Sequence, residues 1–268
     1  MSWSIVMATL RQRRTSLMWY VIGLVTYGWF VVWYFPQFAS NQELMAQIEK
    51  MFSEEMLAAL GAAGMDYGSL GGFLGVEYLN IFWVLIIGFA VIIVAGKAIA
   101  GDIEAGTMEV TLTQPVSRFT VAISRYLALV IYAVVINLAT VLPISLAGEL
   151  YDVKVPTDSM LLLFGVGMLV TLAIGGFAYA LSAFSHSSGR VTGITGGLLG
   201  AMWLVDFISS VNKNTEFLGK LTLFHYWKPG TIINQVAAPA STWWVFGIAA
   251  VVLPVIAVWQ FMRRDVAA

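Results

Sequence analysis

The sequence predicts an all-α membrane protein with six transmembrane helices, on the evidence of its composition and of its long apolar blocks. Of its 268 residues, 59% are hydrophobic and 11% are charged, and the mean hydropathy is +0.84. A soluble domain usually carries about 25% charged residues. Because the apolar residues fall in long blocks with no separate soluble region, we expect a single transmembrane domain over residues 1–268.

Six segments are apolar and long enough to cross a bilayer. A hydrocarbon core about 30 Å thick requires about 20 apolar residues in a helix. The fifth segment is short and rich in glycine, and without it the C-terminus would lie on the other side of the membrane. The predicted spans cover approximately residues 16–38, 77–95, 119–146, 160–184, 191–208 and 243–262.

The distribution of Lys and Arg predicts that both chain ends are cytoplasmic, because basic residues are retained on that side. With six spans, nine basic residues lie on one side and five on the other. The cluster Arg11–Arg14 precedes a span of more than twenty residues, which favours a retained anchor over a cleaved signal peptide. The apolar pattern between Trp3 and Leu10 predicts a short interfacial helix before it. The nine are Arg11, Arg13, Arg14, Lys97, Arg118, Arg125, Arg190, Arg263 and Arg264, and the five are Lys50, Lys154, Lys213, Lys220 and Lys228.

Two outer loops are predicted to contain helices. Residues 42–60 place apolar side chains on one helical stripe, and the acidic residues nearby form either an acidic vestibule or an ordinary solvated face. The segment Phe217–Gln235 is too polar to span but rich in Leu, Ile and aromatic residues. We expect re-entrant or interfacial helices there, with His225 as an interfacial residue. The acidic residues are Glu43, Glu49, Glu54, Glu55 and Asp66.

Several kinds of site are not expected from the residue types. The chain has no cysteine and only two histidines, His186 and His225, so thiolate chemistry and the usual zinc spacings are absent. It has no basic run of the kind that binds nucleic acid. Its two Gly-Lys pairs, at 96–97 and 219–220, are followed by alanine and leucine, so neither fits the phosphate-binding motif G-x-x-x-x-G-K-[ST].

A polar segment over residues 102–118 separates the second and third spans. Acidic residues stand at its beginning, Gly106 lies within it, and Pro115 ends a run of alternating apolar residues, which predicts short structured elements. Ser117 is placed to cap the helix that enters the third span. The alternative interpretation is a loop that only satisfies the helix ends.

The same segment resembles the signature of type-2 ABC transporter permeases. In that family a glutamate precedes Gly-Thr-[Leu/Met]-Glu, leucines follow, and then come Pro-[Val/Leu]-[Ser/Thr]-Arg and a basic residue before the third span. Here Glu104 precedes Gly106-Thr107-Met108-Glu109, and Pro115-Val116-Ser117-Arg118 is followed by Arg125. The chain departs from the family at Thr111 and Thr113, which replace leucines, and at Ser124-Arg125, which replaces Gly-Lys.

The resemblance implies a six-helix permease that pairs with a second permease and with two cytoplasmic ATPase subunits. It also implies that residues 102–118 dock into a groove on the ATPase and act as a rigid lever. ATP and Mg²⁺ would then bind the partner subunit, and this chain would bind no cofactor or metal. The residues expected to couple to the ATPase are Asp102, Glu104, Gly106, Thr107, Met108, Glu109, Leu112, Pro115 and Arg118.

Small residues and aromatic residues on the spans give two further predicted sites. Overlapping G-x-x-x-G steps on the fifth span allow close backbone approach, either within the chain or at a dimer seam, and the resemblance favours the seam. Charges are nearly missing inside the spans, which suits an amphipathic or lipid-like cargo better than a bare ion. The packing glycines are Gly193, Gly196, Gly197 and Gly200; the predicted path comprises Asn80, Phe82, Met202, Trp203, Asp206 and Phe207, with Asn137 and Thr140 as other polar candidates.

We therefore expect the non-enzymatic membrane subunit of an ATP-driven exporter for an amphipathic small molecule, a drug or a lipid-like cargo, in a bacterial or archaeal plasma membrane. The alternative is an ion-coupled secondary transporter, which should show inverted repeats and buried ionisable groups. A third hypothesis, an intramembrane enzyme, requires a nucleophile–base or metal constellation.

Overall fold

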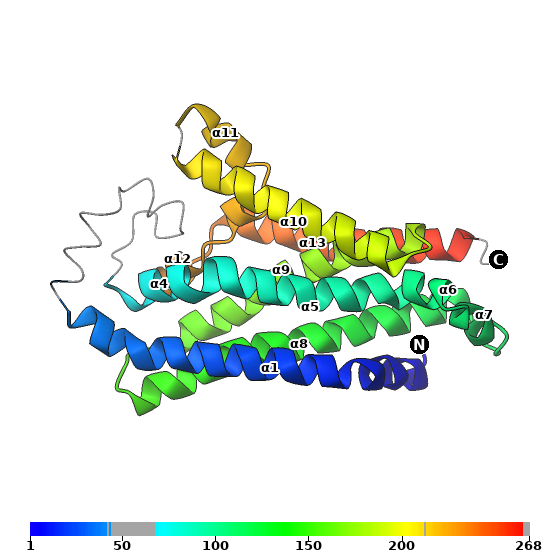
Figure 1. The fold of residues 1–268 in the computed structure, drawn as a ribbon, viewed down its shortest axis with the longest axis horizontal. Helices are drawn as coiled ribbons and strands as arrows, with labels where there is room; N and C mark the ends of the chain where they lie inside the picture. Colours follow the sequence, from blue (N-terminus) through cyan, green and yellow to red (C-terminus); the bar gives the residue numbers. More distant parts are fainter. Residues whose placement is uncertain (42, 44–67, 212, 265–268) are drawn as a thin grey trace.

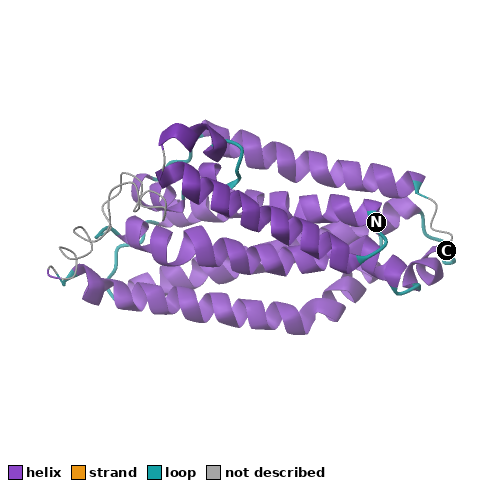
Figure 2. Ribbon diagram, turned by 45° about the horizontal axis from the view of Figure 1, so that its top comes forward, coloured by secondary structure: helices purple, strands orange, loops and turns teal. Residues whose placement is uncertain are grey.

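The computed structural model describes residues 1–41, 43, 68–211 and 213–264, and this part of the chain consists of helices and their connections (Figure 1, Figure 2). Six of its helices are long and apolar enough to cross a membrane. The predicted fold class is thereby confirmed. The outer helix predicted over residues 42–60 and the acidic residues beside it, apart from Glu43, lie outside the described residues.

The first span is one uninterrupted helix, α1 (Trp3–Ala39). The residues predicted to form a separate interfacial helix are its first turns, with no break before the span. Val6 is fully buried there, and the backbone N–H of Ser2 donates to the Ser124 hydroxyl at 2.8 Å. These turns are therefore held against the start of the third span, α8 (Arg118–Leu150).

The second span is a continuous helix of 35 residues, Leu70–Glu104, longer at both ends than predicted. It comprises α4 (Leu70–Leu74), η2 (Gly75–Trp83), α5 (Val84–Gly96), η3 (Lys97–Gly101) and α6 (Asp102–Glu104). The segments η2 and η3 are π-helical, so their backbone hydrogen bonds depart from the regular α-helical pattern. In η2 the carbonyl of Glu77 accepts from the Tyr27 hydroxyl at 2.9 Å, and that of Leu79 accepts from the Trp227 indole at 3.0 Å.

The fourth span, α9 (Thr157–Phe184), lies among the other helices. It packs against α5, against α8 and against the sixth span, α13 (Ala240–Arg263) (Figure 1). The fifth span, α10 (Ser188–Val211), is a full helix of 24 residues despite its glycines. The predicted cap of α8 is also confirmed, because the Ser117 hydroxyl accepts from the Thr120 N–H at 3.1 Å.

Between the fifth and sixth spans the chain forms four short helices at one end of the bundle. They are η4 (Lys213–Thr215), α11 (Glu216–Gly219), η5 (Phe224–Tyr226) and α12 (Pro229–Gln235). The N–H of Gly71 in α4 donates to the Asn234 side chain at 2.9 Å, which ties α12 to the start of the second span. Their position relative to the bilayer stays a prediction.

The beginning of α1, the helices α6 and α7 (Thr107–Leu112), and the end of α13 lie together at the opposite end of the bundle (Figure 1, Figure 2). Burial differs sharply among the spans. The most apolar stretches of the second, third and fourth spans are 56–61% buried, whereas those of α1 and α10 are only 22% and 17% buried. The helices α1 and α10 are therefore the least buried spans, followed by α13 at 28%.

Candidate functional site

The 102–118 segment forms the two short helices α6 and α7 at the end of the bundle (Figure 1). Gly106 lies between them with φ of 68°, in the left-handed region that favours glycine. Its N–H donates to the carbonyl of Ile103 at 3.1 Å, which closes the turn of α6. The signature glycine thus has a backbone role, because it lets α7 begin directly after α6.

One face of α7 is buried and the other is exposed. Met108 is fully buried in the core, and Leu112 packs against the core. These two predicted coupling residues therefore anchor α7 to the bundle. Glu109 and Val110 point outward, and Val110 is 65% exposed. We call Glu109 and Val110 the α7 outer face, an acidic and apolar pair that the described chain leaves uncovered.

Asp102 forms an ion pair with Arg125, which is only 9% exposed. Removing one member of a buried pair leaves the other charge uncompensated, so the pair ties α6 firmly to α8. The hydroxyl of Thr107 donates to the Asp102 carbonyl at 3.3 Å. A polar cavity of about 300 Å³ separates these residues from the first turns of α1, where it is lined by Ser4, Thr9 and Gln12.

Glu104 is turned away from α7 and toward the first turn of α10. Its carboxylate accepts from the hydroxyl of Ser187 at 3.1 Å, from the N–H of Ser188 at 2.9 Å and from the hydroxyl of Ser188 at 2.7 Å. The connection between α9 and α10 is thereby fixed beside α6.

The end of the segment is tied to the C-terminal end of the last span. The guanidinium of Arg118 donates to the backbone carbonyl of Arg264. The Arg264 side chain in turn donates to the carbonyls of Ala183 at 2.7 Å and Ser185 at 2.9 Å, at the end of α9. A cation is favoured at a helix C-terminus. Pro115, by contrast, is exposed.

A buried serine fixes η3 directly before the segment. Ser182 of α9 has no exposed surface. Its hydroxyl accepts from the N–H groups of Ile99 at 3.2 Å and Ala100 at 2.9 Å, and it donates to the carbonyl of Gly96 at 2.8 Å. One side chain thus pairs three backbone groups at the junction of α5 and η3.

The residues predicted for a translocation path are spread over two helices. Asn80 and Phe82 lie on η2, where Phe82 is 51% exposed and its ring centroid is 5.7 Å from that of Tyr27. Trp203 and Phe207 lie one turn apart on α10, with ring centroids 5.8 Å apart. Both α10 rings are only partly buried.

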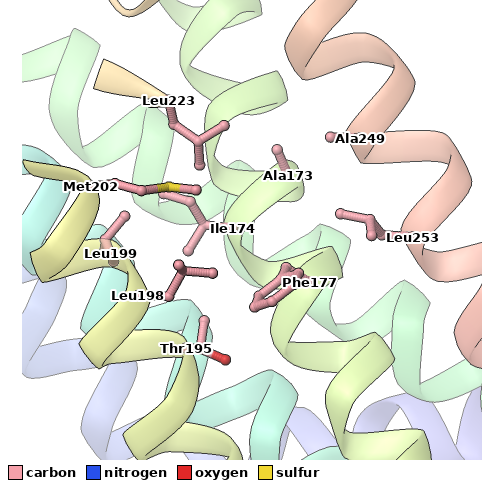
Figure 3. A pocket seen from close by; sticks show the side chains of 10 residues that line it. All are labelled: Ala173, Ile174, Phe177, Thr195, Leu198, Leu199, Met202, Leu223, Ala249 and Leu253. Carbon is pink, nitrogen blue, oxygen red and sulfur yellow. The ribbon is translucent and has the colours of Figure 1, made fainter. Parts of the chain in front are cut away.

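Met202 lines an apolar pocket of about 140 Å³ between α9, α10 and α13 (Figure 3). Of the ten lining side chains, only that of Thr195 carries a polar group. The pocket fits apolar groups, since nothing in it offers a charge. The other lining residues are Ala173, Ile174, Phe177, Leu198, Leu199, Leu223, Ala249 and Leu253.

Asp206 lies at the other end of α10 from Ser188, beside the short helices. Its carboxylate accepts from the Thr222 hydroxyl at 2.8 Å. Burial, followed by the charge of Lys228, lowers the pKa of His225 in the same region. Burial also lowers the pKa of Lys228, while Asp206 acts in the opposite direction. Within the described residues, no group of three or more His, Asp or Glu side chains could hold a metal ion.

The glycine stripe of α10 faces open space. A Cβ atom added at any of its four glycines, Gly193, Gly196, Gly197 and Gly200, would have no neighbouring atom within 4 Å. By contrast, a Cβ at Gly88 of α5 would lie 2.7 Å from Leu199 Cδ2. Packing within the described chain therefore does not explain the stripe.

The polar residues Asn137 and Thr140 form hydrogen bonds in the interior of the bundle. The Asn137 amide donates to the Thr171 hydroxyl at 3.0 Å, and the Thr140 hydroxyl accepts from the Trp83 indole at 2.8 Å. Both residues are 1% exposed. They join α8 to α9 and to η2, because buried polar groups require such partners.

Sequence reasoning did not single out several residues that organise this end of the molecule. Arg125 was visible as part of the signature, but its pairing with Asp102 was not. Ser182, Ser187 and Ser188 give no local signal, because their partners are 82 to 86 positions away in the sequence.

The described geometry agrees with a comparison against protein families. The chain matches the family model described as ABC-2 family transporter protein over residues 3–266. A search among curated proteins found no match. Members of the family are transport subunits of the membrane rather than catalytic chains, and they normally pair with an ABC ATPase subunit. The resemblance drawn from residues 104–125 is confirmed: the chain belongs to the ABC-2 family and is a multi-pass membrane component of an ABC transporter.

Proposed function

We propose that the chain is the permease subunit of an ATP-driven exporter in which the α7 outer face docks onto a separate ATPase. The α7 outer face carries this proposal. Glu109 and Val110 are exposed at one end of the bundle, while the buried Met108 packs the opposite side of α7 into the core. The complex would contain two ATPase copies, and ATP and Mg²⁺ would bind those subunits. The sequence supports this because neither of its Gly-Lys pairs fits a phosphate-binding motif.

A second permease chain, identical or related, completes the proposed complex. The open glycine stripe of α10 supports this, since small residues let helix backbones approach closely in a membrane. The low burial of α10 supports it as well.

The proposed cargo is an amphipathic small molecule, a drug or a lipid-like molecule. The partly buried rings of Trp203 and Phe207 and the apolar pocket around Met202 support an apolar cargo, because aromatic and methionine side chains adapt to varied apolar groups. We place the exporter in a bacterial or archaeal plasma membrane. Membership of the ABC-2 family does not favour the ion-coupled secondary transporter.

Purification of the tagged chain from its native membranes tests this function. We expect an ABC ATPase to be recovered with it, and we expect Glu109→Lys combined with Val110→Asp to remove that subunit. Glu149→Lys combined with Leu150→Asp is the matched control. These two neighbouring residues are also an exposed acidic and apolar pair, but they lie at the C-terminal end of α8, whereas α7 precedes its N-terminal end. Recovery of the chain without any ABC ATPase, together with transport that needs no ATP, would contradict the proposal.

A further inference from the structure

Glu104 caps α10 from a different helix. Ser188 is the first residue of α10, and the first N–H groups of a helix have no partner inside it. The Glu104 carboxylate accepts the N–H of Ser188 and also the hydroxyls of Ser187 and Ser188. A carboxylate at a helix N-terminus also interacts favourably with the helix dipole. The 102–118 segment is thus bonded directly to the fifth span.

The contact between the second and fifth spans continues into the bundle. A Cβ at Gly96 would lie 3.4 Å from both Thr192 Oγ1 and Val191 Cγ1, and a Cβ at Gly88 would lie 2.7 Å from Leu199 Cδ2. The backbone of α5 therefore lies close to α10 side chains at two separate levels. Together with the Glu104 cap, this seam joins α10 to the second span.

Much of the α10 surface is open within the described chain. Its most apolar stretch is 17% buried, and its open face carries the glycine stripe. Trp203 and Phe207 lie further along the same helix. Because a helix moves largely as a rigid element, a shift at its capped end reaches these residues.

We infer that Glu104 is a positioning residue that transmits movement of the 102–118 segment to α10, and that it does not contact the ATPase. The inference rests on the proposed function and assigns different roles to two parts of the segment. The α7 outer face receives the partner, and Glu104 passes the displacement to the fifth span. This role differs from the ATPase contact that the signature implies for Glu104.

Spin labels in the purified permease–ATPase complex test this link. The chain contains no cysteine, so Thr113→Cys and Ile194→Cys place labels at two exposed sites of this chain and at no others in it, one just after α7 and one on α10. We expect their separation to stay the same with and without ATP, because the two elements move together. In Glu104→Gln we expect ATP to change and broaden that separation, while the ATPase remains bound.

Two further variants complete the design. Ser188→Ala removes one hydroxyl donor and keeps the carboxylate, so we expect a smaller effect; combined with Glu104→Gln it should add less than it does alone, as coupled residues do. It also tests the link in the event that Glu104→Gln is not recovered from membranes. Glu149→Gln, at an exposed site far from the cap, should leave the separation unchanged.

The possible failures are distinguishable. A separation that stays fixed in both Glu104→Gln and Ser188→Ala would overturn the inference and leave the proposed function intact. Release of the ATPase by Glu104→Gln, as expected for Glu109→Lys with Val110→Asp, would also overturn it and would favour a direct contact. Failure of the unmodified chain to copurify with any ABC ATPase would overturn the proposed function and the inference together.

Discussion

Single polar side chains join elements that are distant in the sequence. Ser182 pairs three backbone groups of the second span, and Glu104 pairs two side chains and one backbone group at the start of the fifth. Such groups stand at the helix irregularities, where regular backbone pairing is incomplete. The stability of these irregularities therefore depends on individual residues.

At this scale we expect Ser182→Ala to lower the free energy of unfolding by about 1–3 kcal/mol, because it leaves buried backbone groups without their partner. Denaturant unfolding of the purified protein in detergent measures this change. Ser145→Ala is the control, since the half-buried Ser145 hydroxyl donates only to Val141 of its own helix. An equal loss in both variants would show that the loss does not depend on the contact between α9 and η3.

At the scale of the element, apolar runs predict the spans well and their irregularities poorly. The six helices follow from hydropathy, and the cap at Ser117 follows from a serine placed before an apolar run. The π-helical segments η2 and η3 do not follow, because tertiary partners such as Trp227 and Ser182 stabilise them. The continuity of α1 through Arg11–Arg14 was also missed. Long basic side chains can reach water from within a continuous helix.

The candidate site was also predicted only in part, because tertiary packing is not visible in the local sequence. The signature located the 102–118 segment, and Gly106 has the backbone conformation that favours glycine. Which face of α7 is buried depends on packing against the bundle, so the burial of Met108 and the exposure of Val110 could not be predicted from local sequence.

The short helices between the fifth and sixth spans should respond to acid. Because the pKa of His225 is lowered in the fold, the unfolded chain takes up a proton first as pH falls below about 6.5. We therefore expect stability to decline as the pH falls from about 6.5 toward the lowered pKa of the folded state. We expect His225→Gln to make this decline shallower. Thermal unfolding between about pH 7 and pH 5 measures it. His186→Gln, at an exposed site, is the matched substitution; a slope flattened equally by both would exclude His225 as the cause.

At the scale of the whole molecule, the bundle has a well-packed centre and three more open helices, α1, α10 and α13. The second, third and fourth spans provide most of the core, whereas α1 and α10 leave much of their surface open. An open glycine face on a peripheral helix is suited to contact with another chain.

We expect Gly193→Leu combined with Gly197→Leu to reduce association between permease chains by about tenfold, because the added side chains prevent close backbone approach. The fold should be retained, since a Cβ atom at either position has no neighbouring atom within 4 Å in the described chain. Dimerisation measured by fluorescence transfer in proteoliposomes provides the test. Gly247→Leu on α13, another glycine with open space beside it, is the control; if it weakens association equally, the seam is not specific to α10.

The π-helical segment η3 also affects the direction in which α7 faces. A π-helical turn holds more residues than an α-helical turn, so η3 acts as an insertion in the second span. If the same residues instead continued as a regular α-helix, everything beyond them would be rotated by about 100° about the helix axis. Glu104 would then turn away from Ser188, and the α7 outer face would turn with it. The orientation of α6 and α7 thus depends on the local helix geometry of η3.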